Sequence, residues 1–195
     1  MTDPALGLLS EAEYLAAETR ADVRHEYVDG FVYAQAGATK AHGRVAANLV
    51  ALLHGPAAQQ DCWVYASDLR VRLSQGGQRR HYYPDLVVSC GEEGEDDCTA
   101  EENLCLIVEI LSTSTRRIDL SFKLQDYLSL PSLQGYLVVD REAQGAHLYK
   151  RRADTGDWTR EAVQPAVTLP YVGVRLQLAD LYARTGIIQQ APEEG

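Results

Sequence analysis

The order of apolar and polar positions predicts strands interleaved with a few helices. Apolar residues recur at helical spacing after Thr39, which predicts a long helix that ends at His54-Gly55-Pro56. The run Leu104–Leu111 is apolar apart from one charge, as expected of a strand buried on both faces. Asp29-Gly30 lies between two short β-forming runs and predicts the turn of a hairpin.

Weaker signals complete this pattern. Ser10 and Glu13 form a capping-box pattern, which predicts a helix that runs to about Arg20. Strands are expected at 63–65, 69–73, 82–88 and 135–139, a second helix at about 117–129, a second hairpin from 146–150 and 158–163, and a short helix near 178–184. Strands and helices in this order predict one mixed α/β or α+β domain over residues 1–195, with a core at about 11–184 and an acidic tail at 185–195.

Composition restricts the class of protein further. The 195 residues carry 18 basic and 28 acidic side chains, and a net charge of −10 argues against broad, non-specific binding of nucleic acid. A local basic site remains compatible with this charge. No apolar run approaches the roughly 18 residues of a membrane span, and the first residues do not form a signal peptide, so a cytoplasmic protein is expected.

The four cysteines lack the paired spacing of a zinc site. They are expected to be reduced thiols, as is usual in the cytoplasm, with a Cys90–Cys98 disulfide as the less favoured alternative.

Glu109 is the first candidate for chemistry, because it lies inside the apolar run Leu104–Leu111. A carboxylate in a buried strand is costly unless it is paired or binds a metal. Asp85, which follows Pro84 and precedes another apolar run, presents the same problem. The two could share a hard cation at one end of neighbouring strands, and a salt bridge to an arginine is an equally good interpretation of Glu109.

Lys123 is the natural third member of such a site. Asp119, Lys123 and Tyr127 are four residues apart, which places them on one face of the helix that follows the Glu109 strand. The alternative interpretation is a surface Asp–Lys pair worth a few tenths of a kcal/mol.

Short motifs that occur in a fixed order resemble the Uma-type family of restriction-endonuclease-like proteins, a branch of the PD-(D/E)XK nuclease superfamily. The resemblance covers roughly 11–181 and includes the helix with His42. Its motifs are Glu26-Tyr27-Val28-Asp29-Gly30, Pro84-Asp85, Glu109-Ile110-Leu111-Ser112, Asp119-x-x-x-Lys123-x-x-x-Tyr127 and Tyr136-x-Val138-Val139-Asp140. The resemblance implies a restriction-endonuclease-like core, in which helices flank a central mixed β-sheet.

The resemblance also implies roles for single residues. Asp85 matches the metal-binding Asp of the superfamily, and Glu109 matches the acidic residue of its D/E-x-K element. The chain departs from this element at Leu111, where a lysine is expected, and Lys123 on the next helix is the implied replacement. Mg²⁺ or Mn²⁺ is then the implied cofactor. It would be held by Asp85 and Glu109, with Glu26 as a further metal ligand, and Asp119, Tyr127 and His42 would support the site.

Two functions follow as hypotheses. The first is a metal-dependent endonuclease that cleaves DNA, expected to act as a homodimer. The second is a catalytically inactive binding or scaffolding module on a nuclease-like fold, which the missing lysine at position 111 and the acidic net charge favour. Candidate nucleic-acid contacts are Arg70, Arg72, Arg116 and Arg117, although for any one of them an ordinary solvated arginine paired with the acidic excess is the more common interpretation.

Overall fold

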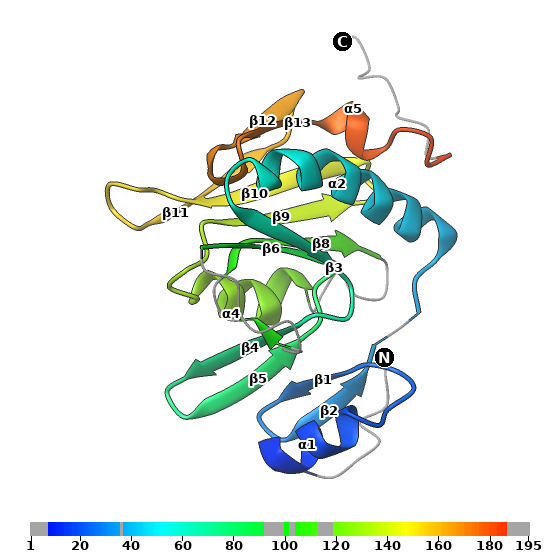
Figure 1. The fold of residues 1–195 in the computed structure, drawn as a ribbon, viewed down its shortest axis with the longest axis vertical. Coiled ribbons are helices and arrows are strands. Elements are labelled where there is room, and N and C mark those ends of the chain that lie inside the picture. Colours follow the sequence, from blue (N-terminus) through cyan, green and yellow to red (C-terminus); the bar gives the residue numbers. More distant parts are fainter. Residues whose placement is uncertain (1–7, 36, 92–99, 102–103, 113–118, 187–195) are drawn as a thin grey trace.

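Two β-sheets, a small β-hairpin and a few helices make up the described chain (Figure 1). The computed structural model describes residues 8–35, 37–91, 100–101, 104–112 and 119–186, with the backbone alone for Gln75, Ala100, Glu101, Asp119 and Pro170. The strands are β1 (His25–Val28), β2 (Phe31–Ala34), β3 (Cys62–Ala66), β4 (Arg70–Gln75), β5 (Gln78–Tyr82), β6 (Leu86–Cys90), β7 (Ala100–Glu101), β8 (Leu104–Leu111), β9 (Gly135–Asp140), β10 (Gly145–Arg151), β11 (Trp158–Ala162), β12 (Ala166–Leu169) and β13 (Val174–Gln177). The helical segments are α1 (Glu11–Glu18), α2 (Lys40–Ala58), the π-helical turn η1 (Asp119–Lys123), α4 (Leu124–Leu128), the 3₁₀ turn η2 (Pro170–Val172) and α5 (Leu178–Leu181).

The larger sheet is mixed, as expected from the sequence. Its six strands lie in the order β11-β10-β9-β8-β6-β3, with β8 parallel to β9 and the other neighbours antiparallel. All eight residues of β8 are buried, which confirms the prediction of a strand covered on both faces. The smaller sheet has the order β2-β1-β5-β4-β7.

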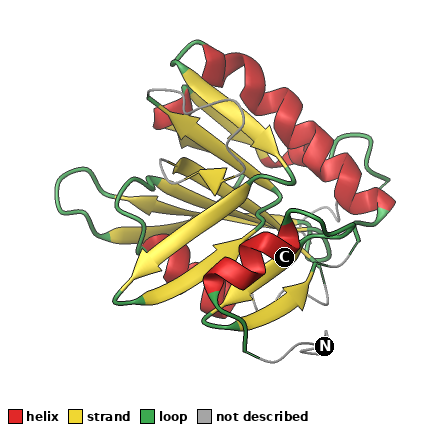
Figure 2. Ribbon diagram, turned by 60° about the horizontal axis from the view of Figure 1, so that its bottom comes forward, coloured by secondary structure: helices red, strands yellow, loops and turns green. Residues whose placement is uncertain are grey.

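The two faces of the larger sheet have different neighbours. Apolar residues of α2 pack on one face against Leu106, Val108 and Ile110 of β8. Ile107 and Leu111, which alternate with these along the strand, pack on the other face with α4 and the β4–β5 hairpin. Figures 1 and 2 show α2 and α4 on opposite sides of the sheet. Glu109 has the same parity as Ile107 and therefore points toward α4.

The first hairpin follows its prediction. Asp29 and Gly30 have positive φ angles of 48° and 102°, and they join β1 to β2 so that Val28 pairs with Phe31. The capping box at Ser10, the start of α2 at Thr39 and the β10–β11 hairpin also form as predicted.

The expectation of one strand over residues 82–88 is wrong. The chain forms β5, which pairs with β1 and β4 in the smaller sheet, and then β6, which pairs with β3 and β8 in the larger sheet. Pro84 lies at the break, where a residue without an amide hydrogen does not interrupt a ladder. Residues 83–85 are therefore the passage between the sheets.

Three other boundaries differ from the prediction. Helix α2 continues through Pro56 to Ala58, because a proline in the last turn removes few backbone hydrogen bonds. Helix α5 ends at Leu181 instead of near Arg184, which has a φ of 57°. The β12–β13 hairpin was not predicted, and its turn contains Gly173 with a φ of 64°.

The prediction of reduced cysteines is also wrong for this structure. Cys62 and Cys90, which are directly paired across β3 and β6, form a disulfide, and Cys105 is a buried free thiol. Cys98 lies outside the described residues. Sequence spacing could not reveal this pair, because strand register brings together residues that are 28 positions apart.

None of the helices in the described part of the chain is long and apolar enough to cross a membrane.

Candidate active site

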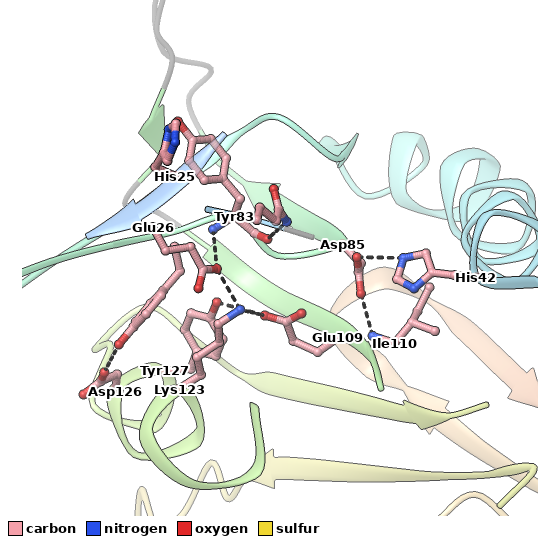
Figure 3. Close-up of polar contacts among 12 residues, drawn as sticks. His25, Glu26, His42, Tyr83, Asp85, Glu109, Ile110, Lys123, Asp126 and Tyr127 are labelled. Carbon is pink, nitrogen blue, oxygen red and sulfur yellow. Dashed lines mark hydrogen bonds and ion pairs between the residues drawn. The ribbon is translucent and has the colours of Figure 1, made fainter. Parts of the chain in front are cut away.

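The passage from β5 to β6 brings carboxylates from both sheets together. Glu26 comes from β1, the neighbour of β5, and Glu109 comes from β8, the neighbour of β6. The backbone amide of Tyr83, in the passage itself, donates a hydrogen bond of 3.3 Å to Oε1 of Glu26. Two acidic residues that are far apart in the sequence therefore face each other where the sheets meet (Figure 3).

Lys123 lies between these two acidic residues. Its Nζ atom is 2.8 Å from Oε1 of Glu26 and 3.2 Å from Oε1 of Glu109. The Lys123 side chain is only 7% exposed, so its charge depends on these carboxylates more than on water. Nζ also lies 5.5 Å from the centre of the Tyr82 ring, a cation–π contact.

Tyr127 completes the contacts of Glu109 on this side. Its hydroxyl donates a hydrogen bond of 3.1 Å to the same Oε1 atom that Lys123 contacts. Lys123 ends η1 and Tyr127 lies one turn later in α4, so both reach Glu109 from one helical face, as their spacing predicts. Lys123 is the last residue of the π-helical turn η1, and π-helical turns are frequent at functional sites.

Asp85 occupies the opposite side of Glu109. Its Oδ2 accepts a hydrogen bond of 2.7 Å from the amide of Ile110, and its Oδ1 is 2.9 Å from Nε2 of His42. The β6–β8 register explains this position, because Leu86 pairs with Val108 and the preceding Asp85 therefore reaches the next residues of β8. Figure 3 shows Glu109 between Lys123 and the Asp85–His42 pair.

The arrangement differs in part from the expected metal site. Glu26 contacts Lys123, whereas Asp85 contacts His42, so these two acidic residues flank Glu109 from two sides and the three carboxylates do not form one chelating group. Among the described side chains, Glu26 and Glu109 form ion pairs with Lys123. The side chain of Asp119 lies outside the described part of the chain, so its expected contact with Lys123 stays a prediction.

Acidic side chains outnumber the ammonium group among the described residues of the site. Three carboxylates, those of Glu26, Asp85 and Glu109, lie around the one ammonium group of Lys123 in this part of the chain. The side chains of Glu26 and Asp85 are 14% and 16% exposed, so both remain in reach of solvent. Carboxylate oxygens are the ligands that Mg²⁺ and Mn²⁺ prefer, and each can accept a further bond. Asp85 and Glu109 therefore have the ligand chemistry of a site for a hard divalent cation, although their carboxylates and that of Glu26 do not form one close group in this structure.

Asp126 and Tyr82 support the site and were missed in the sequence. The Tyr82 hydroxyl donates a hydrogen bond of 2.6 Å to Oδ2 of Asp126, and Oδ1 of Asp126 pairs with Arg80. Burial, and then the bond to Asp126, raise the pKa of Tyr82, so this hydroxyl stays a donor. Asp126 follows Lys123 by three positions, and that spacing was the available signal.

The candidate DNA-binding arginines are only partly described. Arg70 and Arg72 lie on β4, and Nε of Arg72 is 3.3 Å from Oε1 of Glu11 in helix α1. Arg79 on β5 contacts the same carboxylate, 3.4 Å from Oε2. Arg116 and Arg117 lie outside the described residues.

Comparisons with known proteins agree with this fold. The family model Uma2, whose description is "Putative restriction endonuclease", matches residues 11–179. Two uncharacterized proteins of Synechocystis sp. are similar to the chain: slr1290 is 34% identical over 150 residues, and sll1609 is 32% identical over 149 residues. These matches cover 77% and 75% of this chain, and 77% and 83% of the relatives.

A solved structure shares the fold. It is described as a putative nuclease belonging to DUF820 from Anabaena variabilis, and it superposes with a TM-score of 0.67 at 16% identity. The match covers 84% of this chain and 92% of that one. The restriction-endonuclease-like fold expected from the motifs is confirmed, and the chain belongs to the Uma2 family.

Proposed function

We propose that this protein is a divalent-metal-dependent endonuclease that hydrolyses phosphodiester bonds in DNA. The observation that carries the proposal is the buried Lys123 held between Glu26 and Glu109, with Asp85 on the other side of Glu109, at the junction of two sheets. Hydrolysis of a phosphodiester requires an activated water and compensation of the negative charge that develops on the phosphate. The side chains of this site can supply the ligands and the positive charge for these tasks.

Asp85 and Glu109 are the proposed ligands of the cation, with Glu26 as an additional oxygen ligand. Mg²⁺ or Mn²⁺, when bound, supplies Lewis acidity that polarises the phosphate and lowers the pKa of a water molecule. His42 and the Ile110 amide hold the two oxygens of Asp85 in position, as hydrogen bonds to metal-binding carboxylates commonly do.

Lys123 is the proposed electrostatic catalyst. Glu26 and Glu109 fix its ammonium group next to the carboxylates, so little reorganisation is required when a phosphate arrives. From this position the ammonium group can orient the attacking water or interact with a phosphate oxygen. Tyr127 keeps Glu109 oriented through its hydroxyl. A homodimer that presents one such site to each strand of a duplex is part of this proposal.

The test is cleavage of a labelled DNA duplex in the presence of Mg²⁺ or Mn²⁺. Asp85→Asn and Glu109→Gln should each reduce hydrolysis to the level found with a chelator, because each removes a ligand charge and preserves side-chain shape. The matched control is Asp154→Asn, which changes an exposed carboxylate in the β10–β11 loop and should leave the rate unchanged.

Calorimetry with Mn²⁺ separates the two hypotheses. An active enzyme should bind Mn²⁺, and the Asp85→Asn variant should not. Cleavage that is equally fast in the wild type and both variants would contradict the proposal. A chain that folds but neither binds Mn²⁺ nor cleaves DNA would be the binding or scaffolding module instead.

A further inference from the structure

A cluster of three cysteines lies apart from the carboxylates. Cys62 begins β3, Cys90 ends β6 and Cys105 is the second residue of β8, so the cluster crosses three neighbouring strands. Cys62 and Cys105 belong to the apolar core beneath α2, whereas Tyr127 and Tyr82 of the candidate active site belong to the core on the other face. The two sites therefore lie on opposite faces of the larger sheet.

A β-bulge brings the third sulfur into the cluster. Cys62 and Cys90 are directly opposite across β3 and β6, with Cα atoms 4.2 Å apart. Between β6 and β8 the register shifts at Val88 and Ser89, which pair with Leu106 and Leu104 and leave Cys105 as the extra residue. The Sγ of Cys105 lies 2.8 Å from the Sγ of Cys90.

The spacing of the three sulfurs fits a thiolate metal site. The ligand atoms of Cys62, Cys90 and Cys105 all lie within 4.8 Å of one another. Among the described residues, this is the one group of three His, Cys, Asp or Glu side chains that lies so close together. Thiolates about 2.3 Å from a tetrahedral Zn²⁺ are roughly 3.8 Å apart, so small movements would suffice. Soft sulfur ligands select zinc and Cu⁺ over Mg²⁺.

We infer that reduction of the Cys62–Cys90 disulfide converts this cluster into a site for one soft transition-metal ion, with Zn²⁺ as the first candidate. A dithiol reductant supplies two electrons and two protons: the S–S bond breaks, two cysteine thiols form, and the reductant becomes a disulfide. Each thiol that then coordinates the metal as a thiolate releases one proton. The oxidised form lacks two of the three thiolates, so metal binding depends on the redox state.

Burial of the cluster favours a bound metal once the disulfide is reduced. Cys62 and Cys105 are only 4% and 7% exposed. A bound cation supplies the positive charge that a buried thiolate otherwise lacks. The carbonyl oxygen of Gln60, 3.3 Å from Sγ of Cys62, or a water molecule could occupy the fourth position of the metal.

An entry route is present beside Cys62. A pocket of about 300 Å³ at the start of β3 is lined by Cys62 together with His54 of α2 and Asp61 of the turn that joins α2 to β3. Cys90 is itself only partly buried, so a reductant can approach the disulfide from either sulfur.

The test uses the full chain with Cys98→Ser, which removes the one cysteine outside the described residues. The protein is reduced with dithiothreitol, freed of it under nitrogen, and titrated with Cd²⁺ while the thiolate-to-metal charge-transfer absorption is recorded. The expected result is an absorption that saturates at about one ion per chain, as for a single thiolate site. The oxidised protein should show no such absorption.

Variants connect the signal to these residues. Cys105→Ser and, at the more exposed position, Cys90→Ser should each weaken binding by about tenfold or more, with folding verified by circular dichroism. Asp85→Asn should retain the full absorption, because the carboxylate site is separate. A reduced protein without thiolate absorption, or one whose binding survives Cys105→Ser unchanged, would overturn the inference.

Discussion

Lys123 forms ion pairs with two carboxylates of the candidate active site, those of Glu26 and Glu109. Lys123→Met would remove the one ammonium group between Glu26 and Glu109 and leave both carboxylates without its charge. Loss of one member of a buried ion pair should lower the free energy of unfolding by about 3 kcal/mol. DNA cleavage should fall by about 10²–10³-fold, as for removal of a preorganised donor. Urea unfolding and single-turnover cleavage measure the two effects.

A second variant separates catalysis from stability. Glu26→Gln added to Lys123→Met should recover part of the lost stability, because it removes one of the two negative charges that Lys123 contacts, while cleavage stays low. Lys150→Met, on the partly exposed strand β10, is the matched control and should preserve both properties. Recovery of cleavage together with stability would show that Lys123 is only structural.

The sequence identified single residues of the site better than their partners. Glu109 stood out because a carboxylate interrupted an apolar run, and Lys123 and Tyr127 because of their spacing. The Glu26–Lys123 contact could not be predicted, since it depends on how two sheets meet. Tyr82 carried no local signal of this kind, because an aromatic residue in a strand is ordinary, and the only signal for Asp126 was its spacing of three positions from Lys123.

Helix α1 is attached to the smaller sheet through His81, a buried histidine of β5. Its Nε2 is 2.9 Å from Oε1 of Glu11, while its Nδ1 has no hydrogen-bond partner among the described residues. Burial lowers the pKa of His81, Arg70 and Arg72 lower it further, and Glu11 acts in the opposite direction. A second proton on the ring would therefore be buried without an acceptor.

This contact predicts how stability depends on pH. The folded pKa of His81 lies below the ordinary value of about 6.5 that applies in the unfolded chain, so acidification protonates the unfolded state first. The free energy of unfolding should thus fall as the pH drops below about 6.5, by at most about 1.4 kcal/mol per pH unit from this group. Urea unfolding from about pH 7.5 to about pH 5.5 measures the slope.

The slope can be assigned with two variants. His81→Gln should flatten the curve in this window, whereas His54→Gln, an exposed histidine of α2, should retain the wild-type slope. Glu11 does not contribute to the slope of the free energy of unfolding in this pH window. Burial acts to raise its pKa, but the His81 bond, Arg72 and Arg79 outweigh burial and keep the pKa below its ordinary value of about 4.3. An unchanged slope in His81→Gln would contradict the assignment.

The pattern of apolar residues predicted the strands but did not predict every boundary between them. Tyr82 and Leu86 read as parts of one strand, because both are apolar and β-forming, yet they belong to different sheets. The signal for the break was Pro84, and it is this break that places Asp85 beside Ile110. Local pattern can predict strands, but the assignment of a strand to one of two sheets depends on long-range pairing.

On the scale of the whole molecule, the net charge of −10 limits how DNA can be held. Binding in low salt should be weak and should depend on a few arginines, because each phosphate contact contributes a counterion-release term. Arg72 is the candidate on the described surface, although Glu11 contacts its guanidinium group. Arg72→Gln should weaken binding of all DNA sequences alike and reduce the slope of log K against log salt by about 1.

Fluorescence anisotropy with a labelled duplex at several salt concentrations, with Ca²⁺ in place of Mg²⁺ to prevent cleavage, measures this slope. Arg152→Gln is the matched control, since Arg152 is an exposed arginine that pairs with Asp154 in the distant β10–β11 loop. Glu11→Gln should act in the opposite direction to Arg72→Gln, because it relieves Arg72 and Arg79 of a neutralising carboxylate. If both Arg72→Gln and Glu11→Gln leave the affinity and the slope unchanged, DNA does not contact this surface, and the electrostatic part of binding must come from elsewhere in the chain.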